Sequence, residues 1–327
     1  MSQASSISST RCNRRTWMQV AAAGVAAAAS PSSWCRGDQS PARPGCTLSI
    51  GTYSLKGLSI EESIDLVSRT GYDGMEISVQ PGFDGEPAKL SAARRKELRQ
   101  RLESKRLRLT ALMEQLTPAV EDRQHQEHLR RLQQVVELAR QLAPTEPPLI
   151  QTVLGGGQWS QKKSLYRDRL GDWLRVFAAA RLVLAIKPHR GGALSRPDEA
   201  VWLIQQLESP PWLRMVYDYS HYAFRDMPLE ETVRTALPYT AHLAVKDAVK
   251  RDDQIEFLPP GESHTFDYAR LLQLFYAGGY RGDVCCEVSA MVSKKPGYDP
   301  VATAQRCYRN MATAFSQAGV PRRLQER

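Results

Sequence analysis

Short apolar segments alternate with longer amphipathic segments from position 48 to position 318. Most residues of the short segments are apolar, which is typical of strands buried on both faces of a parallel sheet. In the longer segments apolar residues recur at helical spacing, as Ile60, Ile64 and Val67 do. We predict strands at 48–53, 74–78, 107–113, 149–154, 182–187, 213–217, 242–246 and 283–288.

A helix is predicted after each strand. The helices are expected at 60–68, 92–104, 124–141, 163–179, 197–207, 229–236, 266–277 and 300–318. Eight such units predict an α/β protein with a single (β/α)8 barrel, the TIM barrel, over 46–320. The alternative is a doubly wound open sheet with a dinucleotide site, but the glycine run 155–157 lacks the GxGxxG spacing of that site.

The chain before the barrel has the pattern of an export signal and a linker. Arg14 and Arg15 precede an apolar run at 20–29 that ends in three alanines, as in twin-arginine signals. The run is too short to span a bilayer, so we expect no stable membrane anchor. We predict a signal peptide at 1–29, a linker at 30–45 and a polar tail at 321–327. The expected location is therefore the periplasm or outside the cell.

Composition favours a folded domain that does not bind nucleic acid. The chain is 42% hydrophobic and 24% charged, enough apolar residues for a large core. Its net charge is +9, but basic residues are interleaved with acidic ones, as at 94–97 and 246–253, which indicates a solvated surface. In an oxidising compartment Cys35 and Cys46 are a candidate disulfide.

Cys285 and Cys286 are adjacent in a predicted strand and therefore lie on alternate faces. We expect them to be small packing residues. The six cysteines show no paired CxxC spacing of the kind that zinc ribbons use.

Polar side chains occur at the carboxyl end of every predicted strand but the first. In a barrel these ends meet at one mouth, where the chemistry of such folds takes place. Carboxylates and imidazoles suit a divalent ion and a polyhydroxylated ligand. Each residue also has a structural interpretation, since Glu76 can simply accept hydrogen bonds from backbone amides. The residues are Glu76, Glu114, Gln151, Lys187, His189, Asp218, His221, His242, Lys246, Asp247 and Glu287.

The order of several short motifs over 48–318 resembles the sugar phosphate isomerase/epimerase family, whose members are xylose isomerase-like barrels. These motifs lie at 71–76, 184–189, 217–221, 242–247, 260–262 and 279–287. The resemblance implies a barrel that binds a small carbohydrate. It also implies one divalent metal held by Glu, Asp, His and Glu from four strands.

Two of the four implied ligands are present. Asp218 and Glu287 match, but Lys187 stands where the EPH motif has its glutamate, and Ala244 replaces the second histidine of HxHxKD. A protonated lysine cannot bind a metal. We therefore expect Lys187 to replace the cation. The alternative is that His242, two residues from Ala244 and so on the same strand face, supplies one ligand.

The resemblance also implies roles for the remaining residues. The family chemistry moves a proton next to a carbonyl, with a carboxylate as base. We expect Glu287, Lys187 and His221 to be catalytic, with Lys187 stabilising the developing negative charge. The residues expected to contact the substrate are Glu76, His189, His242 and Lys246.

Three functions agree with these residues. The first is a sugar isomerase or epimerase. The second is a non-catalytic carbohydrate-binding barrel whose metal site has degenerated. The third is a lyase or hydrolase acting on oxidised glycosides by the same enolising chemistry.

A related endonuclease of abasic DNA shares the barrel but needs a histidine-rich cluster of several zinc ions. The chain has six histidines, of which His125 and His128 fall in a predicted helix and are expected to be solvated. We therefore expect no nucleic-acid partner.

Overall fold

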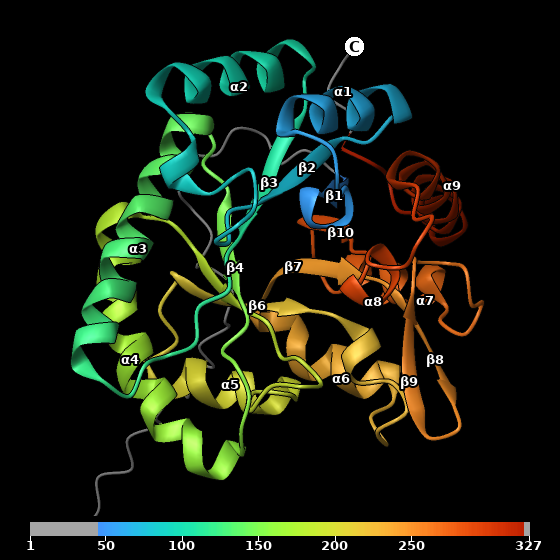
Figure 1. Cartoon of the computed structure of the whole chain (residues 1–327). Coiled ribbons are helices and arrows are strands. Elements are labelled where there is room, and N and C mark those ends of the chain that lie inside the picture. The colour runs from blue at the N-terminus through green and yellow to red at the C-terminus, as the bar shows by residue number, and fades with distance from the viewer. Residues whose placement is uncertain (1–44, 324–327) are drawn as a thin grey trace, which may run out of the picture. The chain divides into compact units, whose positions relative to one another are not determined.

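A computed structural model describes residues 45–323. Eight parallel strands close into a barrel in the order β1-β10-β7-β6-β5-β4-β3-β2. The helices surround it (Figure 1). This confirms the predicted TIM barrel. The barrel strands are β1 (Thr47–Gly51), β2 (Gly74–Ser78), β3 (Arg108–Met113), β4 (Leu149–Thr152), β5 (Leu184–Ile186), β6 (Leu213–Tyr217), β7 (Thr240–Val245) and β10 (Asp283–Cys286).

Local sequence signals set the ends of several helices. Ser59 and Glu62 form a capping box at the first turn of α1, and Gly71 ends that helix with a positive φ of 101°. Asp299 accepts hydrogen bonds from the first turn of α9. The helices are α1 (Ile60–Thr70), α2 (Ala92–Ser104), α3 (Asp122–Leu142), α4 (Trp159–Ala180), α5 (Pro197–Gln206), α6 (Leu229–Ala236), α7 (Tyr268–Ala277), α8 (Ala290–Ser293) and α9 (Pro300–Ala318).

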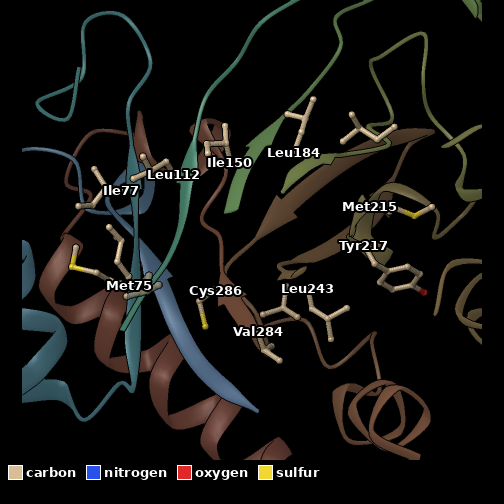
Figure 2. Packing of buried hydrophobic residues seen from close by; sticks show 14 of the residues in the cluster. Met75, Ile77, Leu112, Ile150, Leu184, Met215, Tyr217, Leu243, Val284 and Cys286 are labelled. Carbon is tan, nitrogen blue, oxygen red and sulfur yellow. The ribbon is translucent and has the colours of Figure 1, made fainter. Parts of the chain in front are cut away.

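The hydrophobic core lies between the outer faces of the strands and the helices. Its strand residues include Met75, Leu184 and Cys286 (Figure 2). A separate small cluster of Ala185, Val216 and Ala244 comes from alternate positions of neighbouring strands, so it fills the inside of the barrel. Small residues there leave room for the larger polar side chains at the ends of the strands.

One antiparallel hairpin interrupts the βα repeat and was not predicted. It consists of β8 (Asp247–Arg251) and β9 (Gln254–Leu258), next to β7 in sequence. The two turn residues, Asp252 and Asp253, both have positive φ, as a tight type I′ turn requires. Of the charged residues at 246–253 that indicated a solvated surface, Asp252 and Asp253 form this turn, whereas Lys246 and Asp247 are buried, at 2% and 0% exposure. Phe257 of β9 packs edge-on against the ring of His221 at 5.4 Å.

The prediction that His125 is solvated is wrong. His125 lies in α3, is 1% exposed, and places its Nε2 2.8 Å from Asp172 Oδ2 of α4. The helical periodicity was right, but a histidine on the buried face of a helix needs a polar partner, and the sequence around α3 does not indicate one on α4.

The two ends of the described chain meet at the barrel end opposite the carboxyl ends of the strands. Cys46 is a buried thiol that pairs with Arg322 in a parallel bridge. Arg322, in the predicted polar tail, contacts both carboxylate oxygens of Asp73 at 2.6 and 2.9 Å. Cys35, the proposed partner of Cys46, lies outside the described residues, as does the predicted signal. Within 45–323 no helix is long and apolar enough to cross a membrane.

Candidate active site

Four charged residues meet at the carboxyl ends of four neighbouring strands. Lys187 follows β5, Asp218 follows β6, Lys246 follows β7 and Glu287 follows β10. These strands are consecutive in the barrel. The barrel therefore brings together residues up to 100 positions apart, as the sequence predicted for Lys187. We call these four residues the charge tetrad.

Each ammonium group of the charge tetrad contacts both carboxylates. Lys187 Nζ lies 2.9 Å from Asp218 Oδ2 and 2.6 Å from Glu287 Oε2. Lys246 Nζ lies 2.8 Å from Asp218 Oδ2 and 2.5 Å from Glu287 Oε1. Only Glu287, with 12% of its side chain accessible, is noticeably exposed. Two positive and two negative charges are thus buried as a neutral group, which is the arrangement that makes buried ions tolerable.

The pKa values follow from this pairing. Burial by itself would lower the pKa of Lys187, but Asp218 and Glu287 outweigh burial and raise it. Burial opposes ionisation of Glu287, but the two lysines lower its pKa to about 2. They hold the pKa of Asp218 well below its usual range against the same penalty. Both carboxylates are therefore ionised and Lys187 is protonated at neutral pH.

The oxygens that would bind the metal implied by the sequence already have donors. Asp218 Oδ2 and both Glu287 oxygens accept from the lysines. Asp218 Oδ1 accepts from the hydroxyl of Ser220 at 2.6 Å. Ala244 has no ligand atom, and Lys187 occupies the position of the missing glutamate. The residues present do not fit a divalent ion between Asp218 and Glu287.

Two histidines, with their rings tilted by 48° to each other, lie beside the charge tetrad. The rings of His189 and His221 are 4.0 Å apart. His221 Nε2 lies 3.1 Å from Lys246 Nζ, so Nε2 accepts from the ammonium and the proton is on Nδ1. Burial is the largest cause that lowers the pKa of His221 well below its usual range, and Lys246 adds to it. Both effects keep the imidazole neutral.

His189 is the histidine that reaches the pocket. Burial, followed by the charges of Lys246 and Lys187, lowers its pKa to about 4, so it is neutral at pH 7. Its Nδ1 accepts from the amide of Gly191 at 3.2 Å. The neutral ring therefore carries its proton on Nε2 and is a hydrogen-bond donor there.

A cavity of about 240 Å³ opens beside Lys187, His189 and Glu287. Polar side chains form much of its wall, and the rest includes glycines of two loops, which leave the space open. Lys187 Nζ has two acceptors among residues 45–323, so the third N–H of its ammonium is left for a ligand oxygen. The other polar lining residues are Tyr53, Gln80, Glu114, Gln115, Gln151 and Thr152.

Three residues predicted to contact substrate do not line this cavity. Lys246 lies behind the charge tetrad with acceptors for all three N–H groups. Glu76 and His242 are buried inside the barrel, at 2% and 0% exposure. The side-chain amide of Gln151 separates Glu76 from the cavity and donates to Glu76 Oε2. Burial and the charge of Glu287 raise the pKa of Glu76 to about 8.

The sequence did not single out Tyr53 and Gln80, which follow β1 and β2 and line the cavity. Their positions after strands were a usable signal.

The sequence of residues 64–311 matches the family described as xylose isomerase-like TIM barrel, more than half of the chain. The chain belongs to the xylose isomerase-like TIM barrel family. A comparison with curated proteins finds no significant match.

Solved structures of the same fold include sugar epimerases. An Escherichia coli 3-keto-D-glucoside 4-epimerase is 14% identical, with a TM-score of 0.63 over 83% of this chain and 99% of that one. An L-ribulose 3-epimerase is 15% identical, with a TM-score of 0.66 over 84% and 96%. A Mycobacterium smegmatis barrel in complex with magnesium is 15% identical, with a TM-score of 0.64 over 85% and 99%. At these identities the likeness shows the fold.

Proposed function

We propose that the protein is an isomerase or epimerase that moves a proton next to the carbonyl of a sugar. The observation that carries this proposal is Lys187, a buried cation that is held by two carboxylates and has one N–H left for the cavity. Similarity to barrels named 3-keto-D-glucoside 4-epimerase and L-ribulose 3-epimerase supports a carbonyl-bearing carbohydrate as the substrate class.

The cavity wall suits such a substrate because it carries both hydrogen-bond donors and acceptors. Lys187 and the Nε2–H of His189 are donors, and Glu287 is an acceptor on the same side. Glu114, whose Oε2 is 2.8 Å from Arg131 Nε, is a further acceptor in the wall. A carbonyl oxygen directed at Lys187 and His189 places the adjacent carbon near Glu287, so that proton transfer and charge stabilisation occur at one end of the sugar.

The proposed step transfers the proton from that carbon to a carboxylate oxygen of Glu287. The electrons of the C–H bond form the C=C bond of an enolate, and the carbonyl π electrons move to oxygen. Lys187 and His189 stabilise this oxyanion by donating to it. Protonation of the same carbon on its other face, by a donor on the side of the substrate away from Glu287, gives an epimer. Return of the proton to the former carbonyl carbon, with proton exchange between the two oxygens, gives an isomer.

The ground-state pKa of Glu287, about 2, is low for a base. Lys187 is one of the two causes of this low value. When the oxyanion forms, the Lys187 ammonium donates to it, so its positive charge is shared between the oxyanion and Glu287. The pairing of Lys187 with Glu287 weakens, and the pKa of the Glu287 carboxylate rises as it accepts the proton. Charge development on the substrate and basicity of Glu287 are thus coupled through one ammonium group.

The second candidate is a carbohydrate-binding barrel without catalytic activity. The observation that favours it is the saturation of the charge tetrad, because both carboxylates already pair with both lysines. Such a site binds hydroxyl and carbonyl groups but removes no carbon-bound proton.

Solvent deuterium exchange separates the two candidates. Ketoses and 3-keto-glucosides are incubated with the full chain in deuterated water and followed by NMR. We expect label at the carbon next to the carbonyl, and a loss of at least about 100-fold in exchange rate in Lys187→Met and in Glu287→Gln. Lys96→Met on the exposed surface of α2 is the matched control. Saturable binding without label would overturn the catalytic proposal, and an elimination product would identify a lyase.

We further propose that the protein is exported. The support is sequence alone: Arg14 and Arg15 before an apolar run. Cell fractionation tests this, with the paired variant Arg14→Lys and Arg15→Lys expected to remain in the cytoplasm. Equal periplasmic levels of both forms would contradict a twin-arginine signal. The proposed Cys35–Cys46 disulfide would then be tested by mass spectrometry of the exported form.

A further inference from the structure

A second polar cluster lies inside the barrel and shares no residue with the charge tetrad. Glu76 of β2, His242 of β7 and Cys285 of β10 place one ligand atom each within 4.8 Å of one another. All three are buried, with exposures of 2%, 0% and 2%. We call them the interior triad. Their strands lie close together because β10 pairs with β7 on one side and with β1 on the other, and β1 in turn pairs with β2.

His242 is aimed into this cluster without a hydrogen bond. Neither of its ring nitrogens has a hydrogen-bond partner among the described residues, although both are buried. Its Nε2 lies 3.7 Å from Glu76 Oε2, too far for a hydrogen bond. An imidazole buried in this way loses its hydration without replacement, which is costly. A ligand that binds one of these nitrogens would remove part of that cost.

The backbone leaves room for the carboxylate of the triad. Gly51 of β1 lies beside Glu76, and a Cβ at position 51 would come within 2.8 Å of Glu76 Oε1. Glycine is therefore required for the carboxylate to stay where it is. On the other side of the carboxylate, the Gln151 side chain donates to Glu76 and also lines the cavity, so it lies between the interior triad and the outside.

We propose that Glu76, His242 and Cys285 bind a soft divalent metal ion of the zinc type. The residue set supports this, because thiolate and imidazole favour such ions over magnesium. Zinc ligand bonds of about 2.0–2.3 Å in tetrahedral geometry place ligand atoms roughly 3.3 to 3.8 Å apart, with nitrogen–oxygen pairs near the lower end. The His242–Glu76 separation of 3.7 Å is a few tenths of an ångström longer than such a nitrogen–oxygen pair requires, a difference that small side-chain rotations close. Three protein ligands leave a fourth position for water or substrate.

Charge balance also favours the ion. On binding, the carboxyl group of Glu76 and the thiol of Cys285 would release their protons, and the two resulting negative charges match those of a divalent ion. The charge tetrad is neutral as a group, so it does not repel a cation bound at the interior triad. The interior triad is distinct from the position that the family resemblance implies, because that position has no sulfur ligand.

Cobalt binding to the full chain tests the proposal. The protein is treated with EDTA, desalted, and titrated with Co²⁺ in a reducing buffer free of thiols. We expect one equivalent of Co²⁺ to produce the near-ultraviolet charge-transfer band of a cobalt–thiolate bond. Cys285→Ala should abolish this band and weaken binding by at least about tenfold, since even outer-shell changes cost that much.

Cys286→Ala is the matched control. This neighbour has the same chemistry but faces the hydrophobic core between strands and helices, so its variant should keep the band and the affinity. If Cys285→Ala fails to fold, His242→Gln replaces it, with the expected result that binding weakens by at least about tenfold. Absence of Co²⁺ binding, binding without the thiolate band, or a band that survives Cys285→Ala overturns the proposal. Cobalt binding needs no turnover, so the result is independent of the proposed enzyme activity.

Discussion

Lys187→Met should destabilise the protein through the charge tetrad. The variant keeps most of the side-chain volume but leaves two buried carboxylates, Asp218 and Glu287, facing only Lys246. Removing one partner of a buried ion pair costs about 3–5 kcal/mol. At an unfolding entropy of about 2.1 cal/mol/K per residue, a barrel of this size shifts its Tm by roughly 1.5–2 °C per kcal/mol, so Tm should fall by about 5–10 °C. Thermal unfolding at pH 7 followed by circular dichroism measures this.

A double-mutant cycle shows whether the cause is charge imbalance or lost packing. Glu287→Gln alone leaves both lysines facing only Asp218, so it too should destabilise. Combined with Lys187→Met, it leaves one lysine and one aspartate, and the site is again neutral. The double variant should therefore be more stable than the sum of the single effects predicts, by up to about 3 kcal/mol.

Additive effects within about 0.5 kcal/mol would refute the reasoning, because they would mean that the two side chains stabilise the fold independently. The exposed pair Arg270 and Glu230, 3.2 Å apart with side chains 46% and 55% accessible, is the control. Solvent screens such a pair. The cycle of Arg270→Met and Glu230→Gln should show no coupling.

Three further predictions concern other parts of the barrel. Glu76→Gln, studied with a chelator present, should raise the free energy of unfolding at pH 9 by a few kcal/mol and change it little at pH 4. The magnitude is of the order expected from a pKa of about 8 for Glu76 in the folded protein. The sign follows because a raised carboxyl pKa gives stability at low pH that is lost as the pH rises from about 4.5 to about 8; denaturant unfolding across this range checks it. Gly71→Ala should lower stability by about 1–2 kcal/mol, because φ is 101° and a Cβ would lie 2.8 Å from the Tyr308 hydroxyl. Arg322→Ala should destabilise more than Arg322→Lys, because both variants lose the two-point contact with Asp73 but the lysine keeps a positive charge beside the buried carboxylate; urea unfolding of both variants measures the difference.

The barrel could be predicted because its strands are buried on both sides. An apolar run with helices before and after it has few other interpretations, and eight repeats in a row reinforce each other. The same alternation correctly separated Cys285, inside the barrel, from Cys286, in the outer core. It also predicted Lys187 near Asp218 and Glu287, which the structure places 2.9 and 2.6 Å away.

Depth inside the barrel could not be predicted in the same way. Glu76 and Glu287 were both assigned to strand ends, but Glu76 is the third residue of β2, whereas Glu287 follows β10. Barrel strands are tilted and staggered, so residues at similar positions along their strands lie at different heights. The proximity of Glu76 to Cys285 depends on that stagger and on the closure of β1 against β10. The pattern of apolar and polar residues along the sequence contains neither the stagger of the strands nor the closure of the barrel.

Lys187 and Lys246 together carry the same charge as one divalent ion between Asp218 and Glu287. A cation attached to the chain cannot be lost to a chelator, so the neutrality of the charge tetrad does not depend on metal supply. The difference lies in what remains for a ligand. A metal offers several open positions and can bind two substrate oxygens at once, whereas Lys187 has one N–H left. The second donor must then come from elsewhere, and the Nε2–H of His189 on the same cavity wall is placed to supply it. The proposed activity should therefore depend on His189 as much as on Lys187.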